Sequence, residues 1–474
     1  MSTTTLTTGN GSATTLSPEL ITELRGKVRG AVLAPGESGY DAARTIWNAM
    51  IDRRPGLIIR AAGAADVVQA VNLARTHGLV IAIKGGGHNI AGKAVGDGGL
   101  MLDLSAMKSV RIDPRARTAR VEPGVTLGEF DREAQAFGLA TPVGINSTTG
   151  IAGLTLGGGF GWISRRYGLT VDNLIAADVV TADGKLLRAS ATESPGLFWA
   201  IRGGGGNFGV VTSFEYRLHP VGPEVMAGLI IFPQDNARTL LRQYRKITAR
   251  APRELTAWVV LRKAPPLPFL PAEVHGTDIV VFAVCYCGDL AKGKKAVAPL
   301  RALGKPLADI VGPMPFAGWQ TAFDPLLTPG ARNYWKSHDF AKLSDPLIDL
   351  LVDHAGRVPT PETEVVLVHI GGAVNNVPVI ATSYPHRNVE YIVNVHTRWS
   401  HPSQDQSCIA WARQLFDAMA PHSTGGVYVN FMPEDEGQRV KIGAYGRNYK
   451  RLTTLKAKYD PRNLFRMNQN IKPA

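Results

Sequence analysis

The chain has 474 residues, 45% of them hydrophobic and 19% charged, which excludes a disordered or coiled-coil protein and allows two or three domains. Its net charge of +13 is spread along the chain without a nucleic-acid-binding motif, so we expect no nucleic-acid partner. The chain has only three cysteines, which excludes a disulfide framework. It has no apolar run of 18 residues, so we expect no membrane span. Because the sequence shows no signal or transit peptide, we expect a cytoplasmic protein.

The first 222 residues alternate between strand-like and helix-like segments. Residues 1–17 are rich in Ser, Thr and Gly, which predicts a disordered tail. A helix is expected over 18–30, with Ser17 as its N-cap and Pro18 in its first turn. Further helices are predicted over 64–78 and 126–138, strands over 55–62 and 79–89, three short strands at hairpin spacing over 99–124, two strands over 171–190, and a helix, a glycine turn and a strand over 194–221.

After about residue 222 the pattern changes to long alternating strands. These strands are predicted within 257–262, 278–288, 363–372 and 389–400. Two helices are expected among them, over 236–251 and 407–422, which indicates an antiparallel sheet with helices on one face. The last forty residues are predicted to form a helix over 447–460 and a terminal strand.

Glycine is abundant, 51 of 474 residues, and clusters in loops. A P-loop is rejected for segment 87–94, because Ala94 cannot offer a hydroxyl to magnesium and no helix follows. A dinucleotide-binding G-x-G-x-x-G is rejected for segment 204–209, because a helix precedes it and a strand follows. Converging backbone N–H groups instead favour a long, phosphate-bearing cofactor, with tight turns in a glycine-rich fold as the alternative; the loops are 84–89, 96–99, 150–161 and 203–209.

Four stretches carry a family resemblance: IIRAAGAADVVQAVNLARTHGLVIAIKGGGHN, TTGIAGLTLGGGFGWISRRYGLTVDNL, GGGGNFGVV and YDPRNLFRMNQNI. In this order they resemble the berberine-bridge-enzyme-like FAD-linked oxidases of the vanillyl-alcohol-oxidase / p-cresol-methylhydroxylase superfamily. The resemblance implies an α+β fold. It places an FAD-binding domain of the p-cresol-methylhydroxylase type in two segments, 18–222 and 433–474, with an antiparallel-sheet substrate-binding domain, 223–432, inserted between them.

The resemblance also implies how FAD is held. The histidine of the GGH motif, His88, is expected to form a covalent bond to the 8α-methyl group of FAD. Many members add a cysteine link in a G-x-C motif, but Asn146 stands there, which predicts a single link as in the hydroxynicotine-oxidase branch. A tyrosine of the plant members is likewise replaced by Phe160. The cofactor-binding residues expected besides His88 are Lys84, Gly85, Gly86, Gly87, Asn89, Asn146, Thr148, Thr149, Gly150, Gly153, Leu154, Gly158, Gly161, Asn207, Gly209, Val210, Val211 and Asn430.

Catalytic groups are expected from the substrate domain. The family's Y-x-N motif corresponds to Tyr428-Val429-Asn430, and strand alternation would place both polar side chains on one face. Tyr428 would serve as a base or as a hydrogen-bond donor to substrate. His369 and His396 are the other candidates, the latter with Asn394 and Arg398 on the same strand face. A purely structural role is the alternative for each, and no metal site is expected.

The predicted activity is oxidation of a small-molecule alcohol, amine or sugar by hydride transfer to covalent FAD, with dioxygen as acceptor. Thr149 corresponds to the family's gatekeeper position, and its small side chain favours an oxidase. The alternatives are a dehydrogenase with another acceptor and a flavin-bearing drug-binding or resistance protein. The sequence leaves the substrate, the base and the oligomeric state open.

Overall fold

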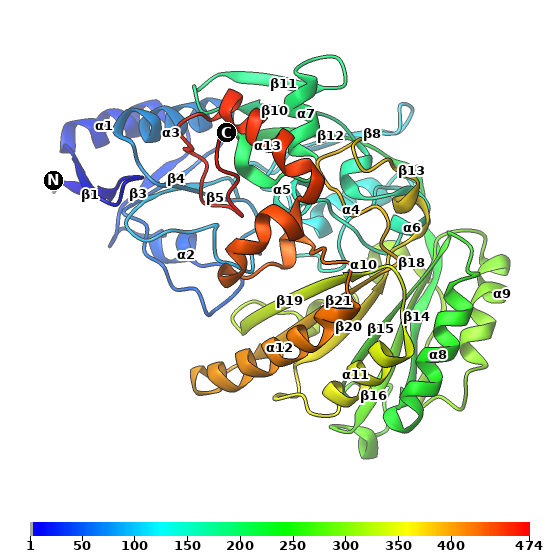
Figure 1. The fold of residues 1–474 in the computed structure, drawn as a ribbon. Coiled ribbons are helices and arrows are strands. Elements are labelled where there is room, and N and C mark those ends of the chain that lie inside the picture. Colours follow the sequence, from blue (N-terminus) through cyan, green and yellow to red (C-terminus); the bar gives the residue numbers. More distant parts are fainter. Residues whose placement is uncertain (1–2) are drawn as a thin grey trace.

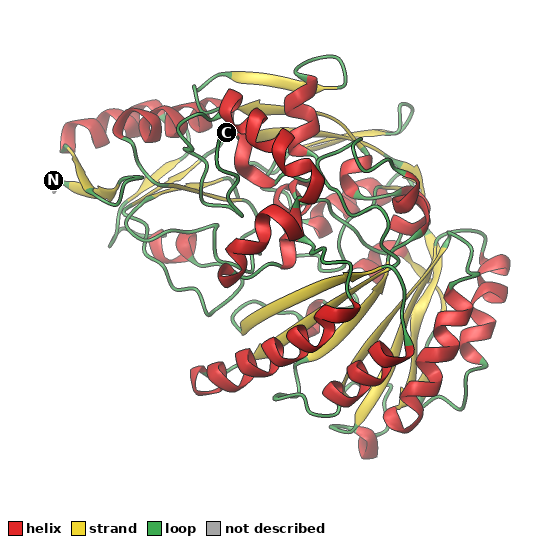
Figure 2. Ribbon diagram, in the orientation of Figure 1, coloured by secondary structure: helices red, strands yellow, loops and turns green. Residues whose placement is uncertain are grey.

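The computed structural model describes residues 3–474, which form two regions lying side by side (Figure 1). The first region contains the N-terminal half and the red C-terminal helix, and the second contains the long strands coloured green to orange. Figure 2 shows that the second region is a sheet with helices along its outer side. The cavity described below lies where the two regions meet.

The first region contains two sheets of unlike topology. The smaller sheet joins three parallel strands, β4, β6 and β5, and adds β3 antiparallel at its edge. The larger sheet is antiparallel, in the order β11-β10-β12-β8-β7. These strands are β3 (Ala31–Leu33), β4 (Leu57–Arg60), β5 (Ile81–Lys84), β6 (Leu100–Asp103), β7 (Val110–Asp113), β8 (Thr118–Val121), β10 (Leu174–Val180), β11 (Leu186–Ser190) and β12 (Val210–Arg217).

Helices surround these two sheets. Helix α1 begins after Ser17, whose hydroxyl accepts the Leu20 N–H, as the sequence predicts. The helices of this region are α1 (Pro18–Lys27), α2 (Tyr40–Arg44), α3 (Ala64–His77), α4 (Leu127–Gln135), α5 (Ile151–Leu156), α6 (Ser164–Tyr167), α7 (Pro195–Ile201) and α13 (Tyr449–Tyr459). A short ladder of β9 (Leu139–Ala140) and β13 (His219–Pro220) leads to the second region.

The second region is the antiparallel sheet that the alternating pattern predicts. Its order is β17-β14-β16-β15-β20-β21-β19, with β18 also paired to β14. The strands are β14 (Glu224–Pro233), β15 (Leu255–Lys263), β16 (Asp278–Tyr286), β17 (Ala308–Asp309), β18 (Gly312–Pro315), β19 (Arg332–Phe340), β20 (Glu364–His369) and β21 (Tyr391–Trp399). Four helices pack against one face of this sheet: α8 (Ala237–Thr248), α9 (Leu290–Arg301), α11 (Asp345–Ala355) and α12 (Asp405–Met419). A fifth helix, α10 (Phe316–Gln320), lies against α4 of the first region.

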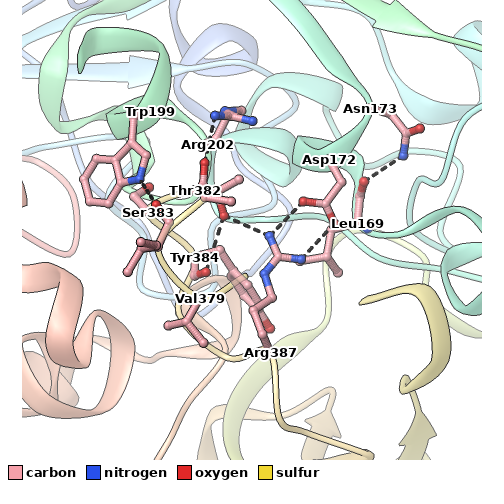
Figure 3. Close-up of polar contacts among 12 residues, drawn as sticks. Leu169, Asp172, Asn173, Trp199, Arg202, Val379, Thr382, Ser383, Tyr384 and Arg387 are labelled. Carbon is pink, nitrogen blue, oxygen red and sulfur yellow. Dashed lines mark hydrogen bonds and ion pairs between the residues drawn. The ribbon is translucent and has the colours of Figure 1, made fainter. Parts of the chain in front are cut away.

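The other face of this sheet turns toward the first region. Trp258 of β15 packs against Trp162 of the first region, with ring centroids 4.4 Å apart and planes tilted by 31°. A strap between β20 and β21 adds polar contacts, which Figure 3 shows. The Arg387 guanidinium forms a two-pronged ion pair with Asp172, at 2.7 and 2.8 Å, and the Tyr384 N–H donates to the Arg202 carbonyl. Because Arg387 is buried and both carboxylate oxygens of Asp172 accept from its guanidinium, the strap holds the two regions against each other.

Three local expectations were wrong. Residues 4–16 are not a disordered tail: β1 (Thr4–Thr7) and β2 (Ala13–Leu16) form a hairpin, because Leu6 and Leu16 are buried in the core of the first region. Residues 1–2 of that expected tail lie outside the described residues. Strand β6 joins the parallel sheet rather than a run of hairpins. No terminal strand follows α13, since the Ile471 N–H is taken by the side chain of Asn207.

Candidate active site

A cavity of about 310 Å³ lies between the glycine loops of the first region and the sheet of the second. Most of the predicted cofactor-binding residues line it: Gly85, Gly86, Gly87, His88, Asn89, Asn146, Thr149, Gly150, Gly153, Leu154, Asn207, Gly209, Val210, Val211 and Asn430. Tyr428 and His396 line it as well. Lys84, Thr148, Gly158, Gly161 and His369 do not, although Thr148 contacts His88 directly.

Two of the glycine loops touch through their backbones. A Cβ added to Gly86 would overlap the backbone of Gly150, and one added to Gly150 would overlap Gly86. Only glycine permits this approach, because any side chain would separate the loops. The contact explains why glycine is needed at both positions: it lets the two loops lie together at one wall of the cavity.

His88 stands at the end of the first glycine loop, and its ring lies beside the side chains of Trp47, Thr148 and Thr149. The indole of Trp47 stacks on it, with ring centroids 5.0 Å apart and planes at 21°. The Thr148 hydroxyl lies 2.9 Å from Nε2, and the Thr149 hydroxyl 3.4 Å from Nδ1. Burial lowers the pKa of His88 to about 4, so the ring is neutral near pH 7 and keeps a lone pair for bond formation.

A polar row crosses the sheet on the cavity side. The strand register sets Arg262 beside Glu364, Glu364 beside His396, and His396 beside Trp335. Glu364 accepts from the Arg262 guanidinium at 2.6 Å and from His396 Nδ1 at 3.1 Å. Burial opposes ionisation of Glu364, but Arg262, His396 and Arg398 outweigh it and lower the pKa of the carboxyl. The carboxylate is therefore charged, and it holds the hydrogen of His396 on Nδ1.

The other nitrogen of His396 is available to a ligand. Nε2 is buried and has no hydrogen-bond partner among residues 3–474, although the ring lines the cavity. The edge of the Trp335 indole packs against this ring, with centroids 4.5 Å apart. Since a buried nitrogen without a partner is costly, Nε2 is the position where a bound molecule would supply the missing hydrogen.

Tyr428 and Asn430 are paired, but not by strand alternation as expected. The segment Val429–Phe431 is a 3₁₀ turn, and the turn brings the Asn430 amide within 2.9 Å of the Tyr428 oxygen. That oxygen also accepts the Gly159 N–H at 3.0 Å. Burial raises the pKa of Tyr428 to about 12 despite these two hydrogen bonds. The phenol thus stays protonated at neutral pH, which favours the role of donor over that of base.

His369 is not part of the cavity. Strand alternation on β20 sends Glu364, Val366 and Val368 to the cavity and His369 to the opposite face. There its Nε2 lies 2.6 Å from the guanidinium of Arg165, a buried residue that reaches across from α6 of the first region. Burial and this cation hold the pKa of His369 well below its ordinary value, so the neutral ring accepts a hydrogen bond from Arg165.

Replacing His369 by leucine should therefore lower stability without affecting the chemistry. The change leaves a buried arginine donor without its acceptor, at a cost of about 1–3 kcal/mol in the free energy of unfolding. Thermal denaturation measures the loss, and His369→Gln, whose amide oxygen can accept from Arg165, should recover most of it. A well-folded leucine variant with greatly slowed flavin reduction would show instead that His369 takes part in the reaction.

The sequence did not single out Glu364, Trp335 or Trp47. One feature of the sequence could have indicated Glu364: it is a charged residue on the same strand face as Val366 and Val368, in a strand that is otherwise apolar on that face. Trp335 and Trp47 carried none, because a lone tryptophan is common in any core. Their roles arise from tertiary contacts: Trp47 lies between His88 and Trp335, with the two indole centroids 5.6 Å apart.

The cavity residues fit an FAD molecule. Backbone of three glycine loops lines one wall, and a Cβ placed on Gly153 would meet no atom of the described residues within 4 Å, which leaves room against that wall. Several buried polar atoms that line the cavity have no partner among residues 3–474, namely Tyr445 Oη, Asn394 Oδ1, His396 Nε2, Trp258 Nε1 and Trp335 Nε1. Buried polar atoms of this kind are normally satisfied, so the cavity is built for a polar ligand.

Comparison with known proteins decides the family. The FAD binding domain model matches residues 55–190, and the model described as berberine and berberine like matches residues 427–472. An FAD-linked oxidoreductase of Dictyostelium discoideum is 32% identical over 96% of this chain and 97% of its own. The chain is a berberine-bridge-enzyme-like FAD-linked oxidoreductase. It is an enzyme, and its cofactor is FAD.

Other relatives of this FAD-linked oxidoreductase identify its fold. The (R)-6-hydroxynicotine oxidase of Paenarthrobacter nicotinovorans is 32% identical over 97% of this chain and 99% of its own. The crystal structure of 6-hydroxy-D-nicotine oxidase from Arthrobacter nicotinovorans superposes with a TM-score of 0.85, at 29% identity, covering 94% of this chain and 98% of that chain. These matches confirm the α+β fold with an FAD-binding domain. Among residues 3–474, the helices are all too short or too polar to cross a membrane.

Proposed function

We propose that this enzyme oxidises a small-molecule alcohol, amine or sugar at a carbon that carries the oxygen or nitrogen. The flavin is attached covalently at His88, and dioxygen accepts the electrons. The observation that carries the proposal is the unpartnered, buried Nε2 of His396 at the cavity, opposite the hydrogen bond from Nδ1 to Glu364. FAD, when bound, supplies the hydride acceptor.

The Glu364–His396 pair suits proton removal from a hydroxyl or ammonium group. Because Glu364 accepts the Nδ1 hydrogen, the lone pair of the imidazole lies on Nε2, toward the cavity. When that nitrogen takes a proton, the carboxylate at 3.1 Å from Nδ1 stabilises the resulting imidazolium. His396 is therefore the base in this proposal, and Glu364 and Arg262 are positioning residues.

Tyr428 would donate a hydrogen bond to the same substrate from a second direction. Its oxygen already accepts hydrogen bonds from Gly159 and Asn430, so its own hydrogen is left for a ligand. A donor at Tyr428 and an acceptor at His396 together complement a hydroxyl or amino group, which both accepts and donates. The ring of Phe431 contacts both Tyr428 and Trp335, with centroids 4.9 and 5.6 Å away, and adds an apolar wall that favours a substrate with an apolar body.

An anaerobic screen tests the proposal. Purified enzyme is mixed with panels of alcohols, amines and sugars without oxygen, and the loss of flavin absorbance is followed by stopped flow. A compound of one of these classes should bleach the flavin, and apolar alcohols or amines should do so at the lowest concentrations. Binding that shifts the flavin spectrum without bleaching it, across all three panels, would favour a drug-binding or resistance protein.

Admission of air to the reduced enzyme tests the acceptor. Rapid reoxidation with one hydrogen peroxide per flavin is expected, because Thr149 lines the cavity with a small side chain. Thr149→Leu should slow this step by filling the space beside the flavin. Slow reoxidation of the wild type, unchanged in the leucine variant, would point to a dehydrogenase with another acceptor.

A further inference from the structure

We infer that Asn146 and Thr148 form a hydrogen-bond relay that fixes the tautomer of His88 and leaves Nδ1 as the atom that bonds to FAD. The inference rests on the covalent link proposed above. It gives a function to Asn146, which stands where a cysteine link would otherwise be expected. Four hydrogen bonds define the relay, and the direction of each one follows from its neighbours.

The backbone N–H of Thr148 fixes the orientation of the Asn146 amide. Its Oδ1 lies 3.0 Å from the backbone nitrogen of Thr148, and its Nδ2 lies 3.4 Å from the Leu327 carbonyl oxygen. A backbone N–H can only donate, so the amide oxygen must face Thr148. The reverse orientation would set two donors against each other at Thr148.

The Asn146 amide oxygen in turn fixes the direction of the Thr148 hydroxyl hydrogen. Its oxygen lies 2.7 Å from Asn146 Oδ1 and 2.9 Å from His88 Nε2. The amide oxygen has no hydrogen to give, so the single hydroxyl hydrogen of Thr148 points to Asn146. The Thr148 oxygen is then an acceptor toward His88, and Nε2 must carry the imidazole hydrogen.

These directions leave Nδ1 of His88 as the reactive nitrogen. With its hydrogen on Nε2, the neutral ring of His88 has its lone pair on Nδ1. The Thr149 hydroxyl, at 3.4 Å from Nδ1, is too distant to hold that lone pair firmly. Trp47 fixes the plane of the ring by stacking on it. The nucleophile is thus selected and oriented before any flavin chemistry begins.

The bond that forms joins His88 Nδ1 to the 8α-carbon of FAD. One hydrogen of the 8α-methyl group and the Nε2 hydrogen, which points at Thr148, leave as protons. The two electrons released reduce the isoalloxazine ring. Dioxygen in solution then takes up these electrons and the two protons, giving hydrogen peroxide and an oxidised, covalently bound flavin.

The test follows covalent incorporation rather than activity. Wild type and the variants Thr148→Val, Thr148→Ser, Asn146→Leu and Asn146→Asp are supplied with FAD, and intact mass records the covalent fraction over time. Proteolysis then releases the flavinyl peptide, and NMR identifies the substituted nitrogen. Serine keeps the hydroxyl and aspartate keeps the acceptor oxygen, so these two variants are the matched controls. Total bound flavin, measured separately, shows that each variant folds.

We expect the wild-type flavin on Nδ1. Thr148→Val and Asn146→Leu should acquire covalent flavin about tenfold more slowly, with some Nε2 isomer, because one lost hydrogen bond lets the other tautomer form. The serine and aspartate variants should resemble the wild type. Attachment through Nε2, or unchanged rates and isomers in the valine and leucine variants, would overturn the relay alone. A wild type without covalent flavin would overturn the proposed link itself, and the relay with it.

Discussion

Replacing His396 by asparagine should lower the rate of flavin reduction about 10²- to 10⁴-fold, the usual contribution of a general base. Asparagine can keep the hydrogen bond to Glu364 through its side-chain amide, but it has no counterpart of Nε2. The amount of bound FAD should stay the same, because the glycine loops and His88 are untouched. Anaerobic stopped flow with a substrate found in the screen measures the rate.

Glu364→Gln provides the second arm of this experiment. The amide can turn its NH₂ group toward Nδ1 and so place the imidazole hydrogen on Nε2, which removes the acceptor from the cavity. It also leaves the buried Arg262 guanidinium without its carboxylate. The matched control is Asp278→Asn, which breaks the neighbouring Lys263–Asp278 ion pair, 2.7 Å long and outside the cavity. Equal losses in both variants would mean that sheet stability, not proton transfer, is affected.

The parts of the site that the sequence predicted are those encoded by local pattern. The KGGGHN stretch places His88 after a strand and a glycine loop, and the structure has it there, at the cavity. The Tyr428–Asn430 pair was predicted for the wrong reason, since a 3₁₀ turn and not a strand brings the two side chains together. Spacing in the sequence was sufficient to suggest the contact, but not the backbone that makes it.

The parts that the sequence did not predict depend on register between distant strands. Glu364 lies 32 residues from His396 and 102 from Arg262 along the chain, and only the pairing of β15, β20 and β21 makes them neighbours. Alternation within one strand gives two faces but does not say which face meets the cofactor. His369 was chosen for its residue type alone, and the register sends it to the Arg165 side.

Gly86→Ala should abolish covalent flavin while Gly26→Ala should not. At Gly86 the added methyl group would overlap the backbone of Gly150, so the two loops must separate, since neither has a flexible side chain that could yield. Overpacking of this kind costs about 1–3 kcal/mol in the free energy of unfolding. The geometric effect on His88, two residues further along the same loop, is expected to be larger than the effect on stability.

Gly26 is the matched control because it lies in α1, away from the cavity, and an added Cβ would meet nothing within 4 Å. Alanine in a helix is favoured over glycine by about 0.5–1 kcal/mol, so this variant should be slightly more stable than the wild type. Acid precipitation followed by absorbance of the redissolved protein measures the covalent flavin, and thermal denaturation measures stability. A Gly86→Ala protein that melts near the wild-type temperature but yields no covalent flavin would show that the loop contact positions His88. Full covalent flavin in that variant would show that the loops can separate without moving His88, and that the contact between Gly86 and Gly150 serves packing alone.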